Sequence, residues 1–200
     1  MEVLGGVSII FRSTNYGDIE FGFFPRVAPR TVEHIFRLVR LGCYNTNHFF
    51  RVINLSITSP PTLLLLFDHT ESGSAPMNDK QKIEAEKTVI DEFSSVKHVR
   101  GILSMGRYSN PNSGGSSFSI LLGDAPHLDG QYAVFGRMTK GDETLKSLKN
   151  FQLPVERITI LSTYYYDTTN ESCDEERFML KRKLAEAAVE IERQRQKCFP

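Results

Sequence analysis

The sequence predicts a mainly β domain followed by a helical tail, and three observations lead to this fold class. Most of residues 7–166 consists of short runs rich in β-branched and aromatic residues, separated by turns that contain glycine, proline or asparagine. Few segments in this range have the pattern of a helix. From Cys173 to Lys197 the chain contains neither glycine nor proline, which is typical of a continuous helix.

The expected strands are recognised by alternating apolar residues and by β-branched or aromatic side chains. The first two strands flank a turn at Asn15-Tyr16-Gly17, as in a hairpin. The runs expected to form strands are residues 7–13, 17–24, 44–53, 89–93, 101–105, 118–122, 132–138 and 155–165.

The clearest helix begins at Pro29 and ends before Gly42, which are standard start and stop residues. Val32, Ile35 and Val39 fall on one apolar stripe of this helix. Two shorter helices are expected at residues 79–87 and 141–148.

Residues 54–77 differ in composition from their neighbours. Two prolines at 60 and 61 precede four leucines at 63–66, and a polar loop follows. We expect this segment to be divergent and irregular, because it has neither the alternation of a strand nor the period of a helix.

The tail, residues 171–198, is predicted to be an amphipathic helix. Leu180, Leu184, Ala187 and Ile191 recur in steps of four and three residues and form one apolar seam. This seam either packs on the domain or pairs with a partner helix.

Composition excludes some classes of function. Lys plus Arg and Asp plus Glu both number 24, so the net charge is zero, which argues against a strongly basic nucleic-acid binder. The longest apolar run is far shorter than the roughly 20 residues of a membrane-spanning helix.

The cysteines, Cys43, Cys173 and Cys198, are too far apart for a metal motif and are expected to be free thiols. The chain as written is expected in the cytosol, whereas an upstream leader would suit a secretory route, so the compartment stays open.

Several motifs follow one another in a characteristic order. Phe49-Phe50-Arg51-Val52-Ile53 is followed by Gly101-Ile102-Leu103-Ser104-Met105, then by a Pro111-Asn112 loop, and Leu128-Asp129-Gly130 precedes a strand ending in Val134-Phe135-Gly136. This order resembles the cyclophilin family over most of residues 7–165, and most closely a divergent plant-type subgroup with a C-terminal helix. The resemblance implies a closed eight-stranded antiparallel β-barrel capped by two helices.

The same resemblance implies a peptidyl-prolyl cis-trans isomerase that acts on X-Pro bonds of proteins without a metal or other cofactor. Arg51 falls on the catalytic arginine of the family. The peptide groove is expected to be lined by Gly106, Arg107, Tyr108, Ser117, Ser119, His127, Leu128 and Tyr132.

Most aromatic and glutamine side chains of the family's groove are absent. After Arg51, the positions of a phenylalanine, an apolar residue and a glutamine hold Ser56, Ile57 and Ser59. Ser117 and Ser119 stand where the family has a glutamine and a phenylalanine. We therefore expect weak isomerase activity, with a catalytically decayed proline-peptide-binding or scaffold module as the alternative. A defective isoform, in which residues 54–77 impair folding, is a third hypothesis.

Overall fold

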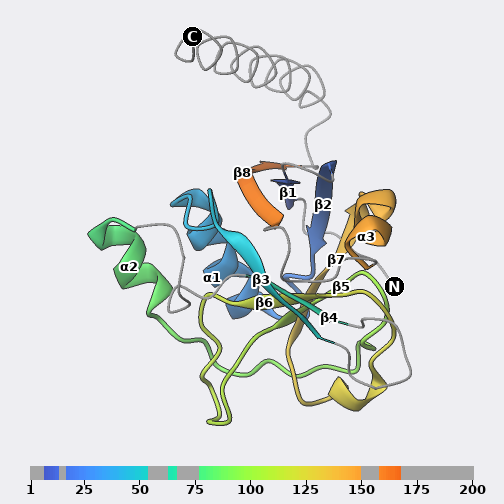
Figure 1. The fold of residues 1–200 in the computed structure, drawn as a ribbon. Helices are drawn as coiled ribbons and strands as arrows, with labels where there is room; N and C mark the ends of the chain where they lie inside the picture. Colours follow the sequence, from blue (N-terminus) through green and yellow to red (C-terminus); the bar gives the residue numbers. More distant parts are fainter. Residues whose placement is uncertain (1–6, 14–16, 54–62, 67–76, 150–157, 168–200) are drawn as a thin grey trace, which may run out of the picture. The chain divides into compact units, whose positions relative to one another are not determined.

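The computed structural model describes residues 7–13, 17–53, 63–66, 77–149 and 158–167. Helices follow successive pairs of strands along most of the chain, and strands predominate (Figure 1). The strands are β1 (Val7–Ser13), β2 (Gly17–Phe23), β3 (His48–Ile53), β4 (Leu63–Leu66), β5 (Ile102–Met105), β6 (Phe118–Leu121), β7 (Val134–Lys140) and β8 (Ile158–Asp167). The helices are α1 (Pro29–Arg40), α2 (Asp79–Ala85), α3 (Asp142–Lys149) and the short 3₁₀ helix η1 (Pro126–Leu128).

The strands form a curled antiparallel sheet. Neighbouring strands follow the order β1-β2-β7-β5-β6-β4-β3-β8. In the described part of the chain α2 lies beside α1, and α3 lies beside β2 (Figure 1). The prediction of a mainly β domain with antiparallel strands and few helices is confirmed.

The two faces of β6 belong to two different apolar clusters. Phe118 and Ile120 join the main core with Phe21, Phe135 and other buried side chains. Leu121 lies on the opposite face, where it packs with Ile102, Val134, Phe24 and Ala125. Side chains alternate between the two faces of a strand, so Ser119 shares the face of Leu121. This second face carries the candidate site.

The prediction that residues 54–77 are irregular is wrong for Leu63–Leu66, which form β4. The backbone of β4 pairs with β3 on one side and with β6 on the other. A run of four identical apolar residues has no alternation, so the sequence pattern cannot distinguish it from a loop or a helical turn. Pairing with strands that are distant in the sequence decides its conformation.

One smaller expectation is also corrected. Residues 89–93 do not form a strand, and only an isolated bridge joins Val89 to Gly114. The described residues contain three α-helices, because α2 and α3 form where the two shorter helices were expected. The other predicted elements are present, with bounds that differ by a few residues.

The chain divides into two compact units, residues 1–165 and 166–200. The predicted helix at 171–198, with its seam of Leu180, Leu184, Ala187 and Ile191, lies outside the described residues. In the described part of the chain, every helix is too short or too polar to span a membrane.

Candidate groove on the outer face of the sheet

One row of residues crosses four neighbouring strands. Arg51 of β3 pairs with Leu65 of β4, Leu65 pairs with Ser119 of β6, and Ser119 pairs with Ser104 of β5. Residues that stand directly opposite in a sheet share one face. The backbone register therefore places Arg51, the candidate catalytic residue, in one row with Ser119.

A line of polar contacts starts from the two serines of this row. The Ser119 hydroxyl donates to the Ser104 carbonyl at 3.2 Å. The Ser104 hydroxyl lies 3.0 Å from His98 Nε2, and His98 Nδ1 lies 3.0 Å from a carboxylate oxygen of Asp129. The same carboxylate oxygen accepts the His98 backbone N–H at 2.8 Å. These bonds tie the turn after η1 to β5 and β6.

Asp129 orients the His98 ring. A carboxylate only accepts hydrogen bonds, so Nδ1 of His98 carries a proton toward Asp129, and Nε2 lies within hydrogen-bond distance of the Ser104 hydroxyl. Hydrogen bonds from the His98 backbone and from Lys97 and His98 side chains lower the pKa of Asp129 to about 2. Asp129 is therefore an anion at physiological pH.

The Asp129, His98 and Ser104 contacts have the connectivity of a hydrolase triad, but they have a different role. Both His98 and Ser104 are 1% exposed. A nucleophile must reach its substrate, so a hydroxyl this deeply buried is not available for attack. The line holds the sheet face and the adjacent turn together.

Arg107 forms a second cluster with two aromatic rings. Its guanidinium lies 5.3 Å from the centre of the Tyr132 ring and 5.7 Å from that of Phe93. Its Nε donates to the Gln131 carbonyl at 3.1 Å. Tyr108, the next residue, is 65% exposed. The structure thus brings together Arg107 and Tyr132, two of the predicted groove residues, and Tyr108 stands at the surface.

Gly106 and Ser117 form a tight contact at the end of β5. The Gly106 N–H donates to the Ser117 carbonyl at 2.9 Å. A Cβ on Gly106 would lie 2.5 Å from the Ser117 hydroxyl oxygen and 2.9 Å from the Ser117 carbonyl oxygen. Only glycine fits at this position without moving the loop.

The remaining predicted groove residues lie on η1. His127 is exposed, whereas Leu128 is partly buried against the cluster of Ile102, Leu121 and Val134. Ser119 of β6, which was predicted to line the groove, is only 5% exposed. The predicted groove residues thus differ in accessibility, and His127 and Tyr108 are exposed whereas Ser119 is buried.

Sequence reasoning missed His98, Ser104 and Asp129 as site residues. Two of their motifs were recognised, since Gly101-Ile102-Leu103-Ser104-Met105 and Leu128-Asp129-Gly130 helped to identify the family resemblance. The contacts among the three residues depend on how β5 and the turn after η1 meet, which no local pattern encodes. Among the described residues, no group of three or more His, Cys, Asp and Glu side chains could hold a metal ion.

Comparison with known proteins adds an independent line of evidence. The model of the cyclophilin-type peptidyl-prolyl cis-trans isomerase family matches residues 9–165. The peptidyl-prolyl cis-trans isomerase CYP23 of Arabidopsis thaliana is 61% identical over 205 residues, covering 98% of this chain and 88% of that protein. A peptidyl-prolyl cis-trans isomerase-like 3 protein of Rattus norvegicus is 37% identical over 150 residues, covering 73% and 83%.

Solved structures agree with these matches. A cyclophilin-type peptidyl-prolyl cis-trans isomerase of Cryptosporidium parvum superposes with a TM-score of 0.67 at 26% identity, covering 81% of this chain and 98% of that one. The same protein, crystallised in the presence of the dipeptide Ala-Pro, gives a TM-score of 0.66 at 27% identity, with 80% and 99% covered.

Proposed function

Because the chain belongs to the cyclophilin-type peptidyl-prolyl cis-trans isomerase family, we propose that it binds proline-containing segments of proteins and accelerates X-Pro rotation at a reduced rate. The observation that carries the proposal is the row of Arg51, Leu65, Ser119 and Ser104 across four strands. This register aligns the arginine that matches the family's catalytic position with the candidate groove.

The chemistry needs no nucleophile and no metal. Rotation about a peptide bond is slow because the C–N bond has partial double-bond character, with a barrier of about 18–20 kcal/mol. In the proposed mechanism Arg51 donates a hydrogen bond toward the prolyl nitrogen, which favours the twisted amide over the planar one. The groove therefore catalyses by binding the twisted state more tightly than the planar state.

The reduced rate follows from the side chains around this arginine. Ser56 and Ser119 offer less apolar contact area to a proline ring than the two phenylalanines that the family has at these positions. Each large apolar side chain lost removes on the order of 1.5–3 kcal/mol of burial. Since about 1.4 kcal/mol corresponds to a tenfold change in affinity, two such losses lower activity by orders of magnitude.

A binding module without catalysis is the second candidate. The burial of Ser119 favours it, because its hydroxyl is bonded to the Ser104 carbonyl instead of facing the surface. Such a module would bind extended proline peptides without accelerating exchange. The apolar seam of the tail would then recruit a partner helix.

The finer architecture is part of the proposal. We infer that residues 7–166 form the family's closed eight-stranded barrel, which the closed strand order supports. We further infer that residues 171–198 form a separate helix, which the division of the chain after residue 165 supports.

A protease-coupled assay with an Ala-Ala-Pro-Phe anilide tests the proposal on the full chain. We expect a measurable acceleration that is at least about tenfold below that of an ordinary cyclophilin, and its loss in Arg51→Ala. A triple variant, Ser56→Phe, Ser59→Gln and Ser119→Phe, tests whether the replaced side chains limit the rate. Acceleration within tenfold of an ordinary cyclophilin would contradict the weak rate, and binding of the labelled peptide without acceleration would favour the binding module.

A further inference from the structure

Four successive backbone carbonyls, those of residues 114–117, are each held by a donor from a different part of the chain. This loop leads into β6, and its last residue, Ser117, is a candidate groove residue. The bonds are Val89 N–H to Gly114 O at 2.8 Å, His34 Nε2 to Gly115 O at 3.0 Å, Tyr44 O–H to Ser116 O at 2.8 Å and Gly106 N–H to Ser117 O at 2.9 Å.

The two side-chain donors belong to α1 and to the segment that follows it. His34 lies on α1 and is 5% exposed, and Tyr44 follows α1 and is fully buried. Gly115 offers a carbonyl, which only accepts, so His34 Nε2 carries the proton. Burial lowers the pKa of His34 below its ordinary value of 6.5, which keeps the ring neutral near pH 7.

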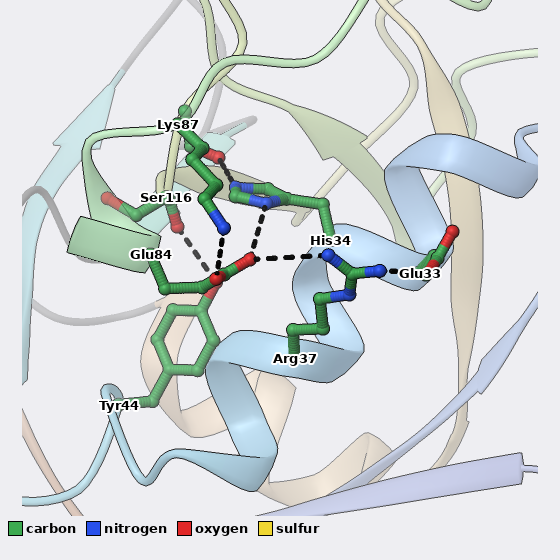
Figure 2. Close-up of polar contacts among 8 residues, drawn as sticks. Glu33, His34, Arg37, Tyr44, Glu84, Lys87 and Ser116 are labelled. Carbon is green, nitrogen blue, oxygen red and sulfur yellow. Dashed lines mark hydrogen bonds and ion pairs between the residues drawn. The ribbon is translucent and has the colours of Figure 1, made fainter. Parts of the chain in front are cut away.

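The other side of the His34 ring faces a charged group (Figure 2). Its Nδ1 lies 4.0 Å from a carboxylate oxygen of Glu84 on α2. Arg37 of α1 lies 3.9 Å from the same oxygen, and Lys87 donates to the second carboxylate oxygen at 2.7 Å. Glu84, Arg37 and Lys87 are the charged groups that face His34, and the pair of Arg37 with Glu84 joins α1 to α2.

We propose that His34 is a positioning residue for the groove, which it serves by holding the loop of residues 114–117 in place from α1. The inference rests on the proposed function, since it concerns the same groove. Gly106 and Ser117 meet so closely that even a methyl group would not fit between them. A shift of the loop would therefore change the groove rim directly.

Amide hydrogen exchange in the full chain, measured by NMR, tests this role independently of catalysis. The Gly106 and Val89 amides report on the loop, because they donate to the carbonyls of Ser117 and Gly114. In His34→Leu we expect both amides to exchange at least about tenfold faster. The Met138 amide, which donates to the Gly101 carbonyl, is the reference and is expected to stay within twofold.

Two further variants complete the test. His34→Gln retains a side-chain N–H donor and is expected to restore exchange to within about threefold of the natural chain. Glu33→Gln, at the neighbouring exposed position of α1, is the matched control and is expected to leave exchange unchanged. Unchanged exchange at Gly106 and Val89 in a folded His34→Leu would overturn the proposal.

Affinity for a labelled Ala-Ala-Pro-Phe peptide separates this inference from the proposed function. We expect His34→Leu to bind at least about fivefold more weakly than the natural chain, and His34→Gln to bind within twofold of it. Faster exchange with unchanged affinity would make His34 a structural residue and would overturn its role in the groove. If the natural chain neither binds nor isomerises the peptide, the proposed function fails, and the exchange measurements alone decide whether His34 holds the loop.

Discussion

Asp129 shows how one side chain connects several parts of the candidate site. Its carboxylate accepts from the backbone and the ring of His98, and it pairs with Lys97 at 3.0 Å. The His98 ring in turn reaches Ser104, which lies in the row that contains Arg51 and Ser119. The Asp129 carboxylate therefore orients the buried His98 ring, and through this ring it connects the turn after η1 to the sheet.

We predict that Asp129→Asn makes the stability of the fold less dependent on pH in the acid range. The pKa of Asp129 is about 2 in the folded state, compared with 3.8 for an ordinary aspartate. Because the folded pKa is the lower one, the charge stabilises the fold above about pH 4, and this contribution is lost as pH falls toward 2. Thermal melts from pH 2 to 7 should show a difference between the natural chain and the variant that is constant above pH 4 and shrinks below it. A difference that does not change between pH 4 and 2 would contradict this assignment.

Cys43 provides a second prediction about a single residue. Burial raises the pKa of its thiol to about 11, and the residue is 1% exposed. The thiolate is the reactive form, so at pH 8 only roughly one part in a thousand is reactive, and the reagent has no access. We expect iodoacetamide to leave Cys43 unlabelled in the native protein and to label it after unfolding in urea, as measured by peptide mass spectrometry. Rapid labelling in the native protein would show that the core around Cys43 opens.

Among the secondary-structure elements, α1 and β4 show which features sequence patterns can predict. Pro29 at the start of α1, Gly42 after its end and the apolar stripe between them are local signals, and the helix forms there. The four leucines of β4 carry no such signal, because their strand conformation comes from partners in β3 and β6. The sequence pattern therefore missed β4, which has long-range partners but no local pattern of its own, whereas strands with an alternating or β-branched pattern were recognised.

We predict that Leu64→Pro in β4 strongly destabilises the domain. Leu64 has backbone partners on both sides, Val52 in β3 and Ile120 in β6. Proline has no N–H, so it removes a ladder bond and leaves a carbonyl unpaired, at a cost on the order of 2–4 kcal/mol. Urea unfolding measures this cost, and Leu64→Val is the control, since a β-branched residue suits a strand. Equal stability of the proline variant would mean that residues 63–66 are not part of the sheet.

For the whole molecule, the order of motifs predicted the family and the mainly β architecture, because both follow from patterns along the chain. The candidate site was only partly predictable. Arg51 and Ser119 were recognised one by one, but their common row requires the register of β3, β4 and β6. The anchoring of the Gly115 carbonyl by His34 joins residues 81 positions apart, so no short motif could indicate it.

The last prediction concerns the division of the chain into two units. Residues 1–165 form one compact unit, and β8 ends at Asp167. A chain that ends at Thr168 keeps every described strand and helix, so we expect its melting temperature to lie within about 3 °C of the full chain. Light scattering after size exclusion compares the two masses. A full chain of higher order than the shortened one would assign the seam of Leu180, Leu184 and Ile191 to self-association. Two monomers of equal stability would exclude that role, and a large loss of stability on truncation would show that the tail supports the domain.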